Sequence, residues 1–264
     1  MLLKKIIQRT GLYENLKYSP IFRFYERLFK SQVRAAHQKE VRLYRKIVGR
    51  ADLIFDIGAY DGHKTAAFLE ISRKVVACEP DPYNFRLLGI RFRSQRGRVV
   101  LCRKAVADRV GTATLLIHHP GSAFNTLNVK WKTMLEADRA MRWKEEIRFT
   151  GEEAEQVATV TLDELIRLHG MPDFIKIDVE GYEKPVFDGL SQKVRCVSFE
   201  CQLPEFSDDL LAILQKLVDL ERETVFNVVH EEELVLTEFV GYDRIVAWLG
   251  QTELFSFDMV ARIK

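Results

Sequence analysis

The sequence predicts a doubly wound α/β fold, in which helices cover both faces of a mostly parallel sheet. The first observation is the alternation, from residue 52 onward, of short apolar runs with helical stretches, which is typical of βαβ units. The second is a glycine-containing turn after the first run and an acidic residue after the second, as in sheets that bind nucleotides. The third is size. A chain of 264 residues, 47% hydrophobic and 30% charged, suits one sizeable domain with a small appendage.

The strands and helices can be assigned in order along the chain. The apolar runs predict strands at 52–57, 74–78, 99–103, 174–179, 194–200 and 224–229. Helices are predicted at 64–69, 81–93, 161–170 and 208–221. Thr161 and Glu164 form a capping box that opens the third of these helices, and Gly170 ends it.

Residues 118–156 interrupt this rhythm. They combine small and polar turn residues with a charged amphipathic helix around 130–146, which carries Trp131 and Trp143. An insertion of this length in a compact domain is often a lid or a binding loop. A surface excursion without a function explains the pattern nearly as well, so both interpretations stay open.

The sequence shows no sign of a membrane span or of disulfide bonds. No segment approaches the roughly 18 consecutive apolar residues of a spanning helix, and the N-terminus lacks the features of a signal peptide. The four cysteines are Cys78, Cys102, Cys196 and Cys201; they have no metal-site spacing, and three of them lie in apolar runs. We expect buried reduced thiols in a cytoplasmic protein.

The turn after the first predicted strand reads DIGAYDG, residues 56–62. Gly58 and Gly62 would let the backbone approach a ligand closely, and the following helix offers free N–H donors. The spacing G-x-x-x-G, with a leading Asp56, differs from the G-x-G-x-x-G of NAD-dependent dehydrogenases. The leading carboxylate suits a ligand with a cationic end.

An acidic residue, Glu79, closes the second predicted strand, 23 residues after Asp56. A carboxylate at this place can accept both ribose hydroxyls of a bound nucleoside. The two motifs therefore predict a ribose-bearing ligand, either NAD or S-adenosylmethionine (SAM). The alternative is structural: Asp81 would cap the next helix, and Glu79 would merely be exposed.

The third motif, DFIKIDVEGYE at 173–183, resembles the signature of the FkbM family of methyltransferases. The matching positions are Asp173, Lys176, Asp178, Glu180, Gly181, Glu183 and the later Gly189. Four further segments also resemble the family: TLD at 161–163, the turn at 56–62, EPD at 79–81 and AVAD at 105–108. The resemblance covers residues 50 to about 200 and is loose outside them.

The resemblance implies a SAM-binding, Rossmann-like sheet of seven strands whose last strand, at 255–263, is antiparallel. It also implies roles for individual residues. Four of them would surround the amino-acid end of SAM: Asp56, Gly58, Ala59 and Gly62. Glu79 would hold the ribose, and Val106 would pack against the adenine. Asp178 would lie beside the methyl group.

Carboxylates gather at or beyond the ends of two predicted neighbouring strands: Asp178, Glu180, Glu183 and Glu200. SAM already activates its methyl group, whereas a hydroxyl acceptor must lose a proton. Asp178 and Glu180 are the candidate catalytic groups. Alternatively, Asp178, Glu180 and Glu200 could form an oxygen-rich Mg²⁺ site. In a third interpretation, Glu180 and Glu183 cap the next helix and never meet a substrate.

The leading functional prediction is a SAM-dependent methyltransferase that O-methylates a sugar or small-molecule hydroxyl. The main alternative is a SAM-fold protein that binds a ligand or partner without catalysis. An NAD-dependent oxidoreductase is disfavoured by the missing G-x-G-x-x-G. No nucleic-acid substrate is expected, because the sequence lacks the N–P–P–Y-type motif of amino-group methyltransferases and any recognised nucleic-acid reader motif.

The first 48 residues are predicted to form a helical arm, ahead of a methyltransferase domain at 49–264. Residues 1–50 hold 13 Lys/Arg against 3 Asp/Glu, and the apolar residues of 21–29 recur at helical spacing. We interpret the arm first as a cap over the SAM cleft, because its aromatic residues would be costly to expose. Peripheral contact with an anionic membrane and attraction of an acidic acceptor are the alternatives.

Overall fold

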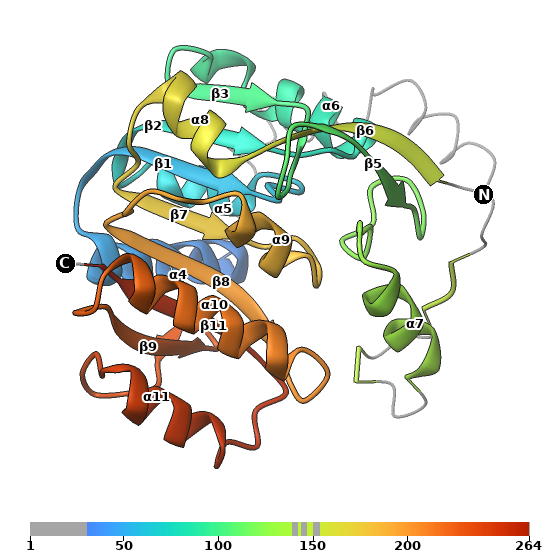
Figure 1. Ribbon diagram of the computed structural model, residues 1–264. Coiled ribbons are helices and arrows are strands. Elements are labelled where there is room, and N and C mark those ends of the chain that lie inside the picture. The colour runs from blue at the N-terminus through green and yellow to red at the C-terminus, as the bar shows by residue number, and fades with distance from the viewer. Residues whose placement is uncertain (1–30, 139–141, 144–146, 150–153, 264) are drawn as a thin grey trace.

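The computed structural model describes residues 31–138, 142–143, 147–149 and 154–263. A large sheet runs through the middle of this part of the chain (Figure 1), with the strand order β10-β9-β11-β8-β7-β1-β2-β3. These strands are β1 (Ala51–Ile57), β2 (Ser72–Cys78), β3 (Val99–Cys102), β7 (Phe174–Ile177), β8 (Cys196–Gln202), β9 (Val225–His230), β10 (Glu233–Leu234) and β11 (Ser256–Arg262).

The directions of the strands confirm the predicted fold class. From β3 to β8 all neighbours are parallel, and β11, the last strand of the chain, is antiparallel to both β8 and β9. The sheet has one strand more than the predicted seven, because the short β10 pairs with β9. A strand of two residues has no periodicity that a sequence could reveal.

Both faces of the large sheet are covered, because its central strands carry apolar side chains on both sides. In β1, Phe55 and Ile57 face one core, and Ile54 faces the other. The helices over the first core are α8 (Leu162–His169), α9 (Glu183–Asp188), α10 (Ser207–Leu220) and α11 (Tyr242–Leu249). Those over the second are α4 (Ser31–Val48), α5 (His63–Phe68) and α6 (Pro82–Arg91), which the short 3-10 helix η1 (Arg93–Gln95) follows. Burial on both faces is what parallel strands require.

A second, three-stranded sheet was not predicted. Its order is β4-β6-β5, formed by β4 (Ala105–Val106), β5 (Gly111–Leu116) and β6 (Ala154–Val160). β5 and β6 are the two strands that lead into and out of the predicted insertion. The helix expected around 130–146 is shorter, because α7 (Val129–Ala137) ends at Ala137, with Asp138 as its C-cap.

The described part of the predicted arm is α4, which packs on the large sheet. The ring of Tyr44 lies 4.7 Å from that of Phe68 in α5. At the C-terminal end of α4, the Arg262 guanidinium donates hydrogen bonds to the carbonyl oxygens of Lys46 (3.2 Å) and Ile47 (2.7 Å). The apolar stretch 21–29, on which the cap prediction depends, lies outside the described residues.

The four cysteines are all free, and three of them, Cys78, Cys196 and Cys201, are buried. The expected burial is thus observed for these three thiols. Within the described ranges, no helix combines the length and the apolar character needed to cross a bilayer.

Candidate functional site

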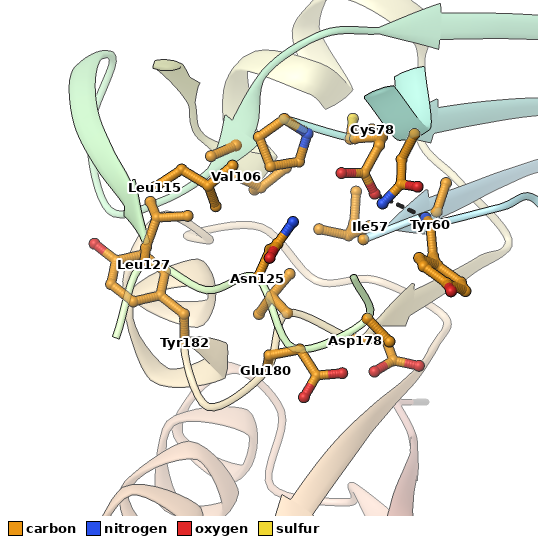
Figure 2. Close-up of a pocket in the computed structure, with 18 of the residues that line it drawn as sticks. Ile57, Tyr60, Cys78, Val106, Leu115, Asn125, Leu127, Asp178, Glu180 and Tyr182 are labelled. Carbon is orange, nitrogen blue, oxygen red and sulfur yellow. Dashed lines mark hydrogen bonds between the residues drawn. The ribbon is translucent and has the colours of Figure 1, made fainter. Parts of the chain in front are cut away.

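A cavity of about 310 Å³ opens at the C-terminal ends of β1, β2 and β7. Doubly wound sheets bind their ligands at this edge. The turn after β1, the end of β2, the small sheet and the loop after β7 line the cavity (Figure 2). Residues 117–128, between β5 and α7, add a further wall through Ser122, Asn125 and Leu127.

The turn after β1 has a backbone approach that only glycine permits. Gly58 has a φ of +80°, and a Cβ placed on it would lie 1.8 Å from the carbonyl oxygen of Asp178. Gly58 and Ala59 line the cavity, whereas Asp56 and Gly62 do not. Asp56 is buried, with 1% exposure. Asp56 and Gly62, two of the four residues predicted around the amino-acid end of SAM, therefore belong to the turn but do not line the cavity.

Glu79 follows β2 and lines the cavity, and its side chain is buried with 6% exposure. Its Oε2 accepts a hydrogen bond from the backbone N–H of Tyr60 (2.8 Å), and its Oε1 accepts one from Asp81 (2.9 Å). Burial raises the pKa of Glu79 to about 8, although these hydrogen bonds oppose the rise. Asp81 does cap α6 through the N–H of Asn84 (2.9 Å), but Glu79 is not exposed. Val106 of β4 lines the same cavity.

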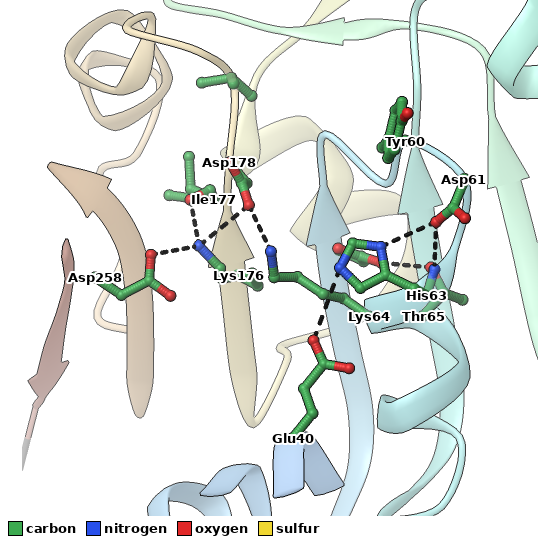
Figure 3. A network of polar contacts seen from close by, with 12 residues as sticks. Glu40, Tyr60, Asp61, His63, Lys64, Thr65, Lys176, Ile177, Asp178 and Asp258 are labelled. Atoms are coloured by element: carbon green, nitrogen blue, oxygen red, sulfur yellow. Dashed lines mark hydrogen bonds and ion pairs between the residues drawn. The ribbon is translucent and has the colours of Figure 1, made fainter. Parts of the chain in front are cut away.

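Asp178, directly after β7, lies between two lysines (Figure 3). Its Oδ2 is 2.9 Å from the Nζ of Lys64 and 3.6 Å from the Nζ of Lys176. Lys176 is completely buried and also pairs with Asp258 of β11 at 3.0 Å. Burial acts to raise the pKa of Asp178, but the charges of Lys176 and Lys64 outweigh it and hold the pKa below its ordinary value. Asp178 is therefore held in its ionised form.

The same region connects the site to α4. The Nδ1 of His63 lies 2.9 Å from Asp61, and its Nε2 lies 3.8 Å from Glu40 of α4 (Figure 3). His63 lines the cavity, but no described residue of α4 does. The described part of the predicted arm thus supports the site through His63.

Glu180 and Glu200 differ from Asp178 in their surroundings. One carboxylate oxygen from each of Asp178, Glu180 and Glu200 lies within 4.8 Å of the other two, so the structure brings the three predicted metal candidates together. Burial, together with the neighbouring carboxylates, raises the pKa of Glu180 and of Glu200 well above the ordinary value. Among the described residues, the buried Oε2 of Glu200 has no hydrogen-bond partner.

The two glutamates predicted to cap the next helix lie in different places, and neither makes a side-chain cap hydrogen bond at the N-cap of α9, Tyr182. Glu183 is the first residue of α9, and its Oε1 accepts a hydrogen bond from the N–H of Val179 (3.2 Å). Burial raises the pKa of Glu183 to about 7, against the hydrogen bonds that it accepts. Glu180 instead lines the cavity.

Several cavity residues were missed by the sequence analysis. Lys64 and Tyr182 lie next to motifs that were recognised, so their positions carried a usable signal. The position of Asn125 carried no such signal, because its contacts are distant in sequence or internal to its loop. Its amide donates to the Oδ2 of Asp81 (2.7 Å), and its Oδ1 accepts from the N–H of His118 (2.9 Å).

Comparison with known families gives one match over most of the chain. The family described as a methyltransferase FkbM domain matches residues 56–226. Among proteins with curated functions, none matches the chain significantly in sequence.

Solved structures resemble this chain at low identity. Methyltransferase FkbM from Methylobacillus flagellatus KT is 13% identical, with a TM-score of 0.47; the match covers 80% of this chain and 43% of that one. This chain thus spans less than half the length of that relative. A precorrin-6y C5,15-methyltransferase from Geobacter metallireducens GS-15 is 10% identical, with a TM-score of 0.42 and coverages of 85% and 87%. A dimethyladenosine transferase from Plasmodium falciparum is 10% identical, with a TM-score of 0.43 and coverages of 85% and 61%.

Proposed function

This chain belongs to the FkbM methyltransferase family, and we propose that it transfers the methyl group of SAM to a hydroxyl of a sugar or another small molecule. The observation that carries this proposal is that neighbouring carboxylates in one cavity differ in whether a lysine is paired with them. Asp178 is paired with two lysines, whereas Glu180 and Glu200 form no ion pair among the described residues. We call the ends of β1, β2 and β7, together with Val106 of β4, the cofactor half. The acceptor half comprises residues 117–128 and 180–182 and the end of β8.

The cofactor half offers groups that suit SAM. Glu79 accepts one backbone N–H on each oxygen, and because a carboxylate has about four acceptor sites, two remain for the ribose hydroxyls. These added donors would favour the ionised form of Glu79. Gly58 and Ala59 leave room for the amino-acid end of the ligand, and Val106 offers an apolar surface to the adenine. When bound, SAM supplies an activated methyl group.

In the acceptor half, Glu180 is the group that removes the proton from the acceptor hydroxyl. A general base works best when its pKa lies near the working pH. The pKa of Glu180 is raised, whereas that of Asp178 is lowered. Asp178 therefore stays ionised and stabilises the cationic sulfonium, while Glu180 takes the proton. When the pKa values of two neighbouring carboxylates are shifted in opposite directions, one can exchange a proton while the other stays ionised.

A divalent cation offers a second route at the same place. Asp178, Glu180 and Glu200 supply carboxylate oxygens, which are the ligands that Mg²⁺ prefers. A bound cation would relieve the repulsion among these carboxylates and would let all three be ionised. If turnover requires Mg²⁺, a chelator abolishes it, whereas a free Glu180 base is indifferent to the chelator.

The test is a screen of acceptors with SAM that carries a labelled methyl group. Sugars and small alcohols are incubated with the protein, and the products are analysed by mass. We expect one labelled methyl on at least one hydroxyl acceptor with the wild type, and none with Glu180→Gln at unchanged SAM affinity. Binding of SAM without any methylated product would favour a non-catalytic SAM-binding protein. Binding of NAD in place of SAM would contradict the proposal.

A further inference from the structure

Glu180 has a backbone conformation that its side chain disfavours. Its φ is +56°, and the next residue, Gly181, has a φ of +81°. Glycine adopts this left-handed region freely, but a residue with a Cβ adopts it at a cost. Such strain persists only where the surroundings hold it, and it is concentrated at functional sites. The contacts that hold this dipeptide therefore bear on the function of Glu180.

Two side chains of the insertion hold both carbonyl groups of this dipeptide. The Thr126 hydroxyl donates a hydrogen bond to the carbonyl oxygen of Glu180 at 2.7 Å. The side-chain amide of Asn128 donates one to the carbonyl oxygen of Gly181. Thr126 is buried, with 1% exposure, so water cannot readily replace its hydroxyl.

The two holding residues are themselves fixed. The backbone of Thr126 exchanges hydrogen bonds of 2.8 and 3.1 Å with Leu116 at the end of β5. Its hydroxyl also accepts the N–H of Asn128 (2.9 Å). The Oδ1 of Asn128 caps α7 by accepting the N–H of Lys130 (2.8 Å). The insertion thus presents two donors from a rigid frame.

Gly181 also packs directly against Trp131 of the insertion. A Cβ added to Gly181 would lie 3.0 Å from the Cβ of Trp131, which is completely buried in α7. The backbone after β7 and helix α7 therefore meet with no room for a side chain between them. Beyond this contact, Glu180 extends toward the cavity beside Asp178 and below Asn125 (Figure 2).

We propose that Thr126 and Asn128 are positioning residues, which hold Glu180 in its left-handed conformation and so direct its carboxylate into the cavity beside Asp178 and Glu200. The catalytic meaning of this arrangement rests on the proposed role of Glu180 as the base. The insertion is then a part of the acceptor half, not a surface excursion.

Matched variants separate the hydroxyl and amide donors from general packing. Thr126→Val keeps the shape but removes the hydroxyl, and Thr126→Ser restores it. Asn128→Ser keeps a residue that can cap α7 but removes the donor to Gly181. The control is Thr133→Val, because the one described hydrogen bond of the Thr133 hydroxyl is to the carbonyl oxygen of Val129 within α7 (2.9 Å).

Whether Asp178, Glu180 and Glu200 lie close enough together to bind a cation can be measured without an acceptor, by titration with Tb³⁺ alone. Luminescence sensitised by the nearby Tyr182 reports occupancy, and Glu180→Gln identifies the signal from this site. We expect Thr126→Val and Asn128→Ser to weaken Tb³⁺ binding roughly two- to tenfold, the range for one lost hydrogen bond. Thr126→Ser and Thr133→Val should bind as the wild type does. SAM titration of the same variants checks that each one is folded.

Three results would overturn the proposal. The first is wild-type Tb³⁺ binding by both Thr126→Val and Asn128→Ser. The second is equal loss in Thr126→Ser and Thr126→Val, since Thr126→Ser keeps the hydroxyl and the hydroxyl would then make no difference. The third is a wild-type chain that does not bind Tb³⁺, since its carboxylates would not converge. If the variants behave as expected but the acceptor screen yields no product, the proposed function fails and the positioning role stands.

Discussion

The two halves of the cavity differ in how their polar groups are satisfied. In the cofactor half, Asp178 has a lysine on each side, and Glu79 accepts two backbone hydrogen bonds. In the acceptor half, Glu180 is strained, and Glu200 keeps a buried oxygen without a described partner. Asp178 is therefore charged before a ligand arrives, whereas Glu180 and Glu200 have raised pKa values and can take up a proton or bind a cation.

The largest expected effect is on the backbone of the cofactor half. Gly58→Ala should lower the free energy of unfolding by roughly 3–5 kcal/mol, because left-handed strain adds to a collision with the Asp178 carbonyl. Gly49→Ala is the matched control. Gly49 has the same φ of +80° but no atom within 4 Å of an added Cβ, so only the strain, roughly 1–2 kcal/mol, should appear. Equal losses in urea unfolding of the two variants would show that the close approach at Gly58 has no special importance.

The next effect tests the charge compensation of Asp178. Lys176→Met should cost about 3 kcal/mol of stability, because it removes the buried lysine that pairs with Asp258 and leaves Asp178 with Lys64 alone. SAM affinity should fall as well. Lys193→Met, which removes an exposed lysine paired with Glu221 on the surface, should change stability by less than about 1 kcal/mol. A Lys176→Met protein as stable as the wild type would remove the main difference between the halves.

A smaller effect concerns the dependence of stability on pH. The pKa of Glu200 is raised by burial and then by Asp178 and Glu183, so the folded state holds a proton that the unfolded chain releases. Its contribution to stability is present at pH values below the ordinary carboxyl pKa and is lost as the pH rises toward the raised value. Glu200→Gln should therefore flatten the decline in unfolding midpoint between mildly acidic and neutral pH. An unchanged pH profile would show that Glu200 carries no raised pKa.

The cofactor half was largely predictable because its residues lie in short continuous segments. Gly58, Glu79 and Asp178 each directly follow a strand with a strong apolar signal, and parallel strands bring such positions to one edge. The sequence did not indicate which of the carboxylates would be paired with lysines. Lys64 and Lys176 reach Asp178 from α5 and β7, and such pairing depends on how the elements pack.

The acceptor half was predictable in composition but not in geometry. The motif at 173–183 identified Glu180, but nothing in it shows that Thr126 and Asn128 bind the carbonyl groups of Glu180 and Gly181. Hydrogen bonds from side chains to backbone across more than fifty residues leave no periodic pattern. For the same reason, the insertion could be interpreted as a lid or as an excursion until its contacts were known.

Calorimetric titration with SAM and NAD tests the central claim, that the cofactor half alone holds SAM, most directly. The wild type and Glu200→Gln should bind SAM alike, and neither should bind NAD. Glu79→Ala should weaken SAM binding roughly tenfold to a hundredfold, the loss expected for charge-assisted hydrogen bonds to the ribose. Binding of NAD with SAM ignored, or equal losses in Glu79→Ala and Glu200→Gln, would contradict the account.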